Sequence, residues 1–339
     1  MAIDCGSQII LCDLPIRFDT YKGCTHGCKY CFAQRKTDLL ADLKPNGTVN
    51  ELINFINGKR NQKTNWCDWD IPLHWGGMSD PFQPIEAKYK ISLECLKILA
   101  ETKYPFVVST KGKLLATDEY LNVLKDCNAV VQISMVCDKY DKLEKGAPTY
   151  QERLEMCKKI SPVCKRLIVR VQPYMREILP DLLENLPKLK EAGVYGITVE
   201  GMKFVKTKPG LEKLAGDYVY PMEALRHDFE IIKEKCHENG LAFFSAENRL
   251  REMGDGMCCC GIEGLEGFRT NTFNICHLLN GCMGEATEKM NEPKTSKCFG
   301  AMYQSTAKGK VYDNASFKDA MLGEYKFNEK SMKKIFGKK

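Results

Sequence analysis

The feature that most constrains this 339-residue chain is a short run that contains Cys24, Cys28 and Cys31. The spacing Cys-x3-Cys-x2-Cys brings three thiols close enough to bind one metal centre, and no fourth cysteine follows at a matching spacing. A 4Fe–4S cluster held by three thiolates keeps one iron open for a small molecule. A zinc site would need His26 as fourth ligand, but His26 is only two residues from either neighbouring cysteine, which strains a shared tetrahedron. A fully ligated electron-transfer cluster would need its fourth cysteine from far along the chain.

The composition fits a large folded chain in a reducing compartment. Hydrophobic residues make up 44% of it, yet no run of eighteen apolar residues occurs, so we expect no membrane span. The first residues lack a charged leader with an apolar stretch. Eighteen cysteines without such a leader favour a cytoplasmic location and metal ligation over a disulfide scaffold. The net charge of +6 is compatible with nucleic acid as a partner but does not establish it.

Short apolar runs alternate with helical patterns along the first two thirds of the sequence. The predicted strands are 16–20, 71–76, 106–109, 130–135, 167–172, 196–200 and 241–245. The predicted helices are 49–57, 86–101, 118–125, 149–159, 179–192 and 222–239. This alternation predicts parallel strands with right-handed crossovers in a partial or full α/β barrel. Chemistry in such barrels lies at the carboxyl ends of the strands, and the cysteine run follows the first strand at that end.

Several helix ends carry recognisable residues. Thr117 precedes the helix at 118–125 and is a suitable N-cap. Gly193 and Gly240 directly follow helical patterns, and we expect each to end its helix.

Polar or small residues stand where the predicted strands end. Gly76 and Gly77 follow the second strand and would let the backbone approach a ligand closely. Lys111, Ser134 and Arg170 stand at the ends of later strands, where a guanidinium group suits a carboxylate. A plain turn, solvated loop polarity or contact with a substrate would account for the same residues.

Four segments together resemble the radical S-adenosylmethionine (SAM) superfamily and, within it, the spore photoproduct lyase-like group. Residues 21–31 look like that group's cluster loop, with its His-Gly before the second cysteine. Residues 79–86 are similar to its Asp-Pro-Tyr-Gln-Pro-x-Glu segment, and 109–111 to its Thr-Lys strand end. Residues 146–154 look like its Gly-x-Pro…Glu-Arg-Leu helix entry.

The resemblance implies a partial (β/α)6-type barrel with a 4Fe–4S cluster on Cys24, Cys28 and Cys31. SAM would chelate the open iron and be cleaved by one electron to a 5′-deoxyadenosyl radical. An electron donor such as flavodoxin or ferredoxin would be a partner. The residues expected to contact SAM are Tyr30 near the adenine, Gly76 and Gly77 at the methionyl amine, and Ser79, Lys111, Ser134 and Arg170.

The sequence changes character near residue 250, where glycines and cysteines become dense. We therefore divide the chain into a partial barrel at 1–249 and a cysteine-rich extension at 250–339 that packs over the barrel mouth. A second iron–sulfur cluster, thiols that quench a substrate radical, and small buried hydrophobes are the explanations left open for its cysteines. These cysteines are Cys258, Cys259, Cys260, Cys276, Cys282 and Cys298.

The predicted function is that of a radical SAM enzyme which takes a hydrogen atom from its substrate. Photoproduct lyases place a hydrogen-donating cysteine before a Thr-Ser-Asp stretch, whereas residues 77–80 here read Gly-Met-Ser-Asp, so thymine-dimer repair is not predicted. The resemblance and the basic charge favour a nucleic acid or nucleotide as substrate, the C-terminal cysteines favour a peptide or protein, and a small metabolite would fit a closed barrel mouth. Two alternatives of another class are a non-catalytic iron–sulfur protein for electron transfer or redox sensing, and a zinc-stabilised nucleic-acid-binding module.

Overall fold

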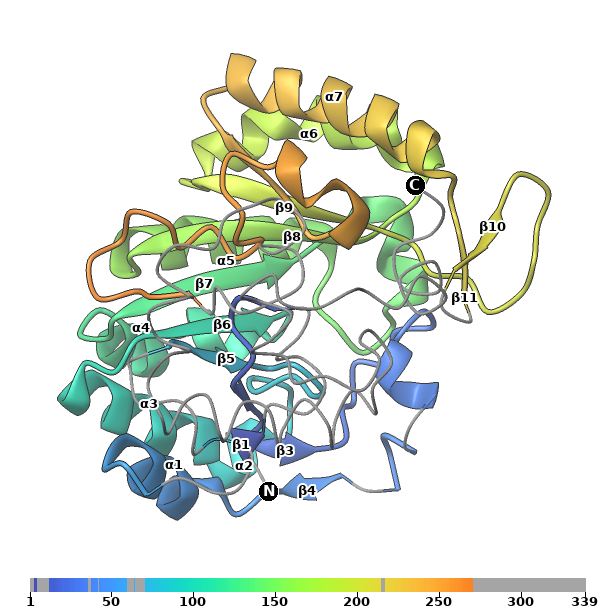
Figure 1. Ribbon diagram of the computed structural model, residues 1–339. Helices are drawn as coiled ribbons and strands as arrows, with labels where there is room; N and C mark the ends of the chain where they lie inside the picture. Colours follow the sequence, from blue (N-terminus) through green and yellow to red (C-terminus); the bar gives the residue numbers. More distant parts are fainter. Residues whose placement is uncertain are drawn as a thin grey trace, which may run out of the picture.

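The structure, a computed structural model, describes residues 3–4, 12–35, 38–41, 43–59, 64, 71–214 and 217–270. Its centre is an eight-stranded sheet in the order β1-β2-β5-β6-β7-β8-β9-β12, in which β1 is antiparallel and the other strands are parallel (Figure 1). These strands are β1 Ile3–Asp4, β2 Arg17–Phe18, β5 Leu73–Trp75, β6 Phe106–Thr110, β7 Ala129–Ser134, β8 Arg166–Tyr174, β9 Gly196–Gly201 and β12 Ala242–Ser245. Two small antiparallel sheets pair β3 Tyr21–Lys22 with β4 Lys44–Pro45, and β10 Glu212–Leu214 with β11 Asp217–Val219.

Seven α-helices of the described chain surround this sheet. They are α1 Thr48–Ile56, α2 Glu86–Tyr89, α3 Ile91–Thr102, α4 Asp118–Leu124, α5 Tyr150–Ile160, α6 Leu179–Glu191 and α7 Met222–Glu238. Helices α3 to α7 follow the sheet along one side, which we call its outer face (Figure 1). Within the described ranges, no helix combines the length and apolar character needed to cross a membrane.

The seven strands and the helices predicted from the sequence are confirmed, with small differences at their ends. The helix expected at 86–101 is divided because Lys90 adopts a left-handed φ of 51° between α2 and α3. Gly193 and Gly240 end their helices as predicted, with φ values of 79° and 65°. Thr117 stands at the N-cap position of α4 as predicted, but its hydroxyl donates to the Leu114 carbonyl at 2.8 Å and makes no capping hydrogen bond.

The two faces of the sheet differ sharply in polarity. Side chains alternate along each strand, so Trp75, Val108 and Val131 share the outer face with Val169 and Ile197 and are exposed by 1% or less. Helix α7 covers part of this face, where the rings of Phe229 and Phe243 lie 5.6 Å apart. Burial of each such side chain contributes about 2 kcal/mol to stability.

The opposite, inner face carries a row of polar side chains. The strand register places them on one side: Arg17 pairs with His74, Ser109 with Gln132, and Arg170 with Thr198; these six residues are the inner polar row. A hydrophobic core does not require these groups, so they mark the inner face as the side of the sheet available for binding.

The beginning of the cysteine-rich extension packs on the inner face. The Arg166 guanidinium donates from Nη1 to the carbonyls of Gly261 and Glu263, at 2.7 and 2.8 Å. A boundary near residue 250 and a cover over the barrel mouth stay predictions, because residues 271–339 lie outside the described residues together with Cys276, Cys282 and Cys298.

Candidate active site

The three cysteines lie on a loop of defined shape between β3 and the short 3-10 helix η2 (Phe32–Arg35). The loop begins at Gly23, whose φ is 77° and where an added Cβ would lie 2.2 Å from the Leu39 carbonyl oxygen. The Cys24 amide donates to the same carbonyl at 3.1 Å, and the Cys31 amide donates to the Cys28 carbonyl at 3.0 Å. Each of the three cysteines is partly exposed. The loop thus presents three accessible thiols on a constrained backbone.

Residues 79–86 hold this loop in place through hydrogen bonds. Gln83 donates from Nε2 to the Gly23 carbonyl at 3.0 Å and accepts the Thr25 amide on Oε1 at 2.9 Å. Glu86 accepts the Tyr21 hydroxyl, and the Ser79 hydroxyl donates to the Tyr21 carbonyl at 2.6 Å. Gln83 and Glu86 are fully buried, so these bonds are shielded from water and fix the loop firmly.

His26 joins the loop to two other parts of the chain. Its Nδ1 lies 3.0 Å from the Gly146 carbonyl oxygen, and its Nε2 lies 3.0 Å from Asp80 Oδ2. A carbonyl oxygen only accepts, so Nδ1 carries a proton. Burial lowers the pKa of His26, but the Asp80 carboxylate outweighs it and the pKa is raised overall. Both ring nitrogens are engaged, so His26 is not a free zinc ligand.

Asp80 collects four donors at the base of the site. In addition to His26, Oδ1 accepts the Thr110 hydroxyl at 2.6 Å and the Phe82 amide at 2.9 Å, and Oδ2 accepts the Lys111 amide at 2.6 Å. Burial would raise the pKa of Asp80, but His26 and these donors lower it to about 2. Asp80 is therefore a permanent anion that ties the cysteine loop to the end of β6.

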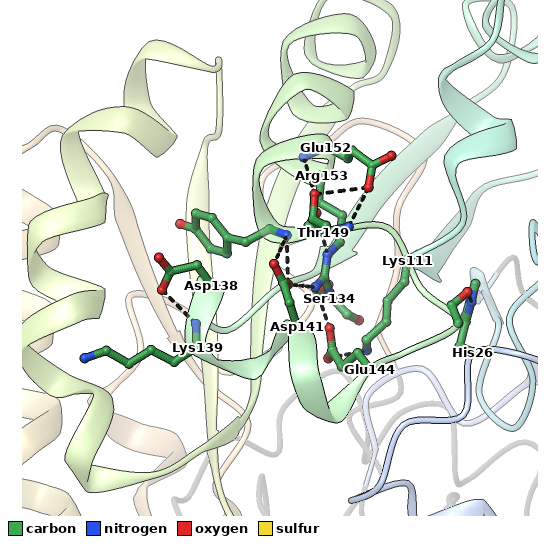
Figure 2. Close-up of polar contacts among 12 residues, drawn as sticks. His26, Lys111, Ser134, Asp138, Lys139, Asp141, Glu144, Thr149, Glu152 and Arg153 are labelled. Atoms are coloured by element: carbon green, nitrogen blue, oxygen red, sulfur yellow. Dashed lines mark hydrogen bonds and ion pairs between the residues drawn. The ribbon is translucent and has the colours of Figure 1, made fainter.

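A buried ion pair lies beside the loop at the end of β7 (Figure 2). Arg153 is fully buried, pairs through Nη2 with Glu144, and donates from Nη1 to the Ser134 carbonyl at 2.7 Å. Lys111 Nζ lies 3.8 Å from Glu144 Oε1 and 5.8 Å from the centre of the Tyr30 ring. Burial lowers the pKa of Lys111. The pair holds Lys111 and Ser134 at one edge of the cysteine loop.

The structure gathers three of the predicted SAM contacts beside Glu144, while Ser79 and Arg170 have hydrogen-bond partners of their own. Tyr30, Lys111 and Ser134 gather beside Glu144, and the buried Tyr30 hydroxyl has no hydrogen-bond partner among the described residues. The Ser79 hydroxyl is engaged by the Tyr21 carbonyl. Arg170 lies in the inner polar row as the register partner of Ser134, and its side chain contacts Gln132 and Gln172.

Gly76 and Gly77 end β5 as predicted, in a backbone turn that Gly76 makes possible. Its φ is 89°, and an added Cβ would lie 2.4 Å from the Ser109 carbonyl oxygen, so a larger residue does not fit. The two amides that follow, of Met78 and Ser79, donate to Asp19 Oδ1 at 2.9 and 3.2 Å.

The cysteine loop carries the ligand set of a three-thiolate iron–sulfur cluster. Within the described ranges, no three Cys, His, Asp or Glu side chains converge as ligands of one ion. A 4Fe–4S cluster does not need such convergence, because each thiolate binds a different iron. Burial raises the pKa of Cys24 to about 12 and that of Cys28 to about 11, so both thiols release a proton when they bind iron.

The C-terminal cysteines that the structure describes are packed thiols. Cys258 and Cys260 are each 1% exposed, and burial raises the pKa of Cys258 to about 12. Together with Cys259 they form no three-ligand metal group among the described residues.

Several residues important for this geometry were not predicted to have a role. Asp80, Gln83 and Glu86 stand in the segment that carried the family resemblance, and Arg153 stands in the helix entry, so the motifs contained the signal. Gln132 sits within an apolar strand sequence, and its contact with Arg170 is a side-chain hydrogen bond between neighbouring strands that the sequence does not reveal.

Comparison with solved structures defines the class of fold. Spore photoproduct lyase complexed with dinucleoside spore photoproduct matches with a TM-score of 0.54 and 16% identity, over 67% of this chain and 75% of that one. A mutant of the same enzyme with bound AdoMet and the dinucleoside photoproduct also gives a TM-score of 0.54 at 16% identity, over 68% and 76%. The chain therefore has the partial-barrel fold of the radical SAM enzymes. Within that class its fold is of the spore photoproduct lyase type, which confirms the expected fold.

Comparison of sequences finds relatives of higher identity over a shorter part of the chain. Uncharacterized proteins of Mycobacterium bovis and Mycobacterium tuberculosis are 28% identical over 208 residues, which is 56% of this chain. The match spans 59% of the length of these relatives. The search against protein-family profiles returns no match.

Proposed function

We propose that this chain is a radical SAM enzyme whose cluster is held by Cys24, Cys28 and Cys31. The observation that carries the proposal is the cysteine loop itself, with three accessible thiols braced by residues 79–86 in a spore photoproduct lyase-type fold. A cluster bound there supplies an open iron for SAM and the electron that cleaves it to a 5′-deoxyadenosyl radical.

The residues around the loop have distinct roles in this proposal. Asp80 and Gln83 keep the thiols in position through His26 and the loop backbone. Gly76 permits the tight turn after β5, where an added Cβ would lie 2.4 Å from the Ser109 carbonyl oxygen, and in this proposal the turn faces the methionyl part of SAM. Lys111 and the unpartnered Tyr30 hydroxyl border the loop on the other side and would bind polar groups of SAM.

A nucleic acid or nucleotide is the substrate class that we propose. Support comes from the net charge of +6 and from the fold shared with an enzyme that binds a dinucleoside photoproduct. The reaction differs from that of the lyase in this proposal, because residues 77–80 lack its hydrogen-donating cysteine. The peptide alternative rests on the C-terminal cysteines, of which the three described ones form no metal group within the described chain.

The electron donor that we propose is an acidic redox protein such as flavodoxin or ferredoxin. Lys22, Lys29 and Lys44 are exposed around the cysteine loop, so its rim is basic. Charge of this sign attracts an acidic partner and raises its association rate. The chemistry also requires a reducing environment, in keeping with a cytoplasmic location.

The test is reductive cleavage of SAM under anaerobic conditions. The protein is reconstituted with iron and sulfide, reduced with dithionite and supplied with SAM, and 5′-deoxyadenosine is measured. We expect product from the wild type and from Cys164→Ala, which removes a thiol far from the loop, but not from Cys28→Ala. An iron-loaded wild type that forms no product would reject the enzymatic role and favour electron transfer or redox sensing.

The substrate class is tested in the same assay. Deuterated nucleotides, deuterated DNA or RNA, and a deuterated peptide mixture are added in separate assays. Transfer of deuterium from each of them into 5′-deoxyadenosine is measured. Stimulation by the peptide mixture alone would contradict the nucleotide proposal.

A further inference from the structure

Arg170 on the inner face of the sheet has no anionic partner at contact distance. Its Nε donates to the Gln172 side-chain oxygen at 2.5 Å and its Nη1 to that of Gln132 at 3.0 Å. Both partners are neutral amides, and within the described residues no carboxylate forms an ion pair with Arg170. The nearby Glu200 is occupied by Lys203 Nζ at 2.5 Å and by the Gln172 amide. A guanidinium in these surroundings is a strong binding group for an oxyanion.

The hydrogen bonds around Gln132 fix the direction of its side-chain amide. Arg170 and the Ser109 hydroxyl, at 2.8 Å, both meet the side-chain oxygen, and an arginine can only donate. The amide nitrogen of Gln132 therefore points away from both, and it is buried without a partner among the described residues. The side chain is 0% exposed, so this pair of N–H donors is desolvated and requires an acceptor.

A third group lies next to Arg170 on the neighbouring strand. Thr198 is its register partner on β9, is 1% exposed, and has a hydroxyl without a hydrogen-bond partner in the described part of the chain. Arg170 thus contacts the Gln132 side chain on β7 and is the register partner of Thr198 on β9. The three side chains share the inner face in the middle of their strands, and each has hydrogen-bonding capacity left for one bound group.

The surrounding charges favour an anion at this place. His74 contacts Ser109 through Nε2 at 3.2 Å, and burial together with Arg170 and Arg17 lowers the pKa of His74 to about 3. The Ser109 proton is directed to Gln132, so His74 donates from Nε2 as a neutral ring. The inner polar row therefore carries the charges of Arg17 and Arg170 without a histidine cation, and its field attracts an oxyanion.

We propose that Gln132, Arg170 and Thr198 form an oxyanion-binding subsite that holds a phosphate group of the substrate. This inference rests on the proposed function and specifies its substrate as a phosphorylated nucleoside or a nucleic-acid strand. The carboxylate of SAM has the same acceptor chemistry, so the experiment must separate these two sources.

The test measures binding of inorganic phosphate to the reconstituted protein with SAM present, by titration calorimetry. Gln132→Glu gives Arg170 an internal carboxylate partner, and Thr198→Val removes one hydroxyl with little change in shape. We expect phosphate affinity to fall at least about tenfold in Gln132→Glu and roughly threefold to tenfold in Thr198→Val. Gln151→Glu, which adds the same charge on the exposed surface of α5, is the matched control and should leave phosphate binding unchanged.

The same variants are assayed for 5′-deoxyadenosine formation without substrate. Their KM for SAM should equal that of the wild type. A raised KM for SAM with unchanged phosphate binding would assign the subsite to the SAM carboxylate and overturn the proposal, as would a wild type that binds no phosphate at millimolar concentration. Failure of the wild type to cleave SAM would reject the proposed function, while the phosphate titration would still decide the subsite.

Discussion

The buried ring of His26, between two cysteines of the loop, lies 3.0 Å from the carboxylate of Asp80, which is 54 residues further along the chain. The pair connects the cysteine loop to the end of β6, because Asp80 also accepts the hydroxyl of Thr110 and the amide of Lys111. The position of the thiols thus depends on a side chain outside the cysteine loop.

Asp80→Asn should impair cluster binding. The substituted amide would place a donor against the Lys111 amide or against His26, and loss of one partner of a buried ion pair costs about 3–5 kcal/mol. We expect a lower thermal midpoint and iron content reduced several-fold after reconstitution. Glu155→Gln, which breaks the exposed pair with Lys158, is the control and should change stability by less than about 0.5 kcal/mol. Iron content equal to the wild type in Asp80→Asn would contradict this role.

Gly23→Ala separates steric fit from backbone strain at the start of the loop. The new Cβ would lie 2.2 Å from the Leu39 carbonyl oxygen, so the loop must move and iron binding should be lost. Gly47 has a similar left-handed φ of 63°, with no atom within 4 Å of an added Cβ. Gly47→Ala should therefore cost only about 1 kcal/mol and keep full iron content. Equal iron loss in both variants would show that strain alone is responsible.

The pair of Arg153 and Glu144 should show strong coupling in a double-mutant cycle. Arg153→Met leaves the buried Glu144 carboxylate without its main partner, and we expect it to lower the free energy of unfolding by about 3–5 kcal/mol. Arg153→Met combined with Glu144→Gln should recover at least about 1 kcal/mol of that loss. Denaturant titration measures both values, and strictly additive effects would argue against the buried pair.

Asp19→Asn should change how stability depends on pH. Burial raises the pKa of Asp19 from 3.8 to about 6, although the amides of Met78 and Ser79 lower it. The folded state therefore binds this proton more tightly, and the free energy of unfolding decreases as pH rises between these two values.

Asparagine keeps the acceptor at position 19 and removes the charge. The variant should equal the wild type below pH 4 and exceed it by about 1 kcal/mol above pH 6, a value reduced for partial solvent exposure. The free energy of unfolding of both proteins is measured across this pH range. A difference between variant and wild type that does not change with pH would contradict the raised pKa of Asp19.

The sequence was sufficient to predict the fold because strand and helix patterns are local. The alternation of short apolar runs with helical patterns predicted the seven parallel strands, and Gly193 ends α6 as expected. The motif around Cys28 predicted which loop carries the thiols. Lys111 follows β6 and Ser134 ends the neighbouring strand β7, as expected, while their contact with SAM stays a prediction.

The remaining parts of the site depend on contacts between distant segments. The partner of His26 could not be read from the sequence, because its position depends on how residues 79–86 pack under the loop. Arg170 was grouped with Lys111 as a strand-end residue, and the register pairs it with Ser134 at the end of β7, but its side-chain contacts with Gln132 and Gln172 could not be read from the sequence. Side-chain direction along a strand reverses with a shift of one residue, so the partners of Arg170 could be identified only from the structure.

The most direct test of the central claim is the electron paramagnetic resonance spectrum of the reduced, reconstituted protein before and after addition of SAM. If Cys24, Cys28 and Cys31 hold a cluster with one open iron, SAM should change the spectrum, and 17O in its carboxylate should broaden or couple to the signal. Cys28→Ala should show no such cluster signal. A wild-type cluster signal that SAM leaves unchanged would mean that no iron is open, and it would contradict the account.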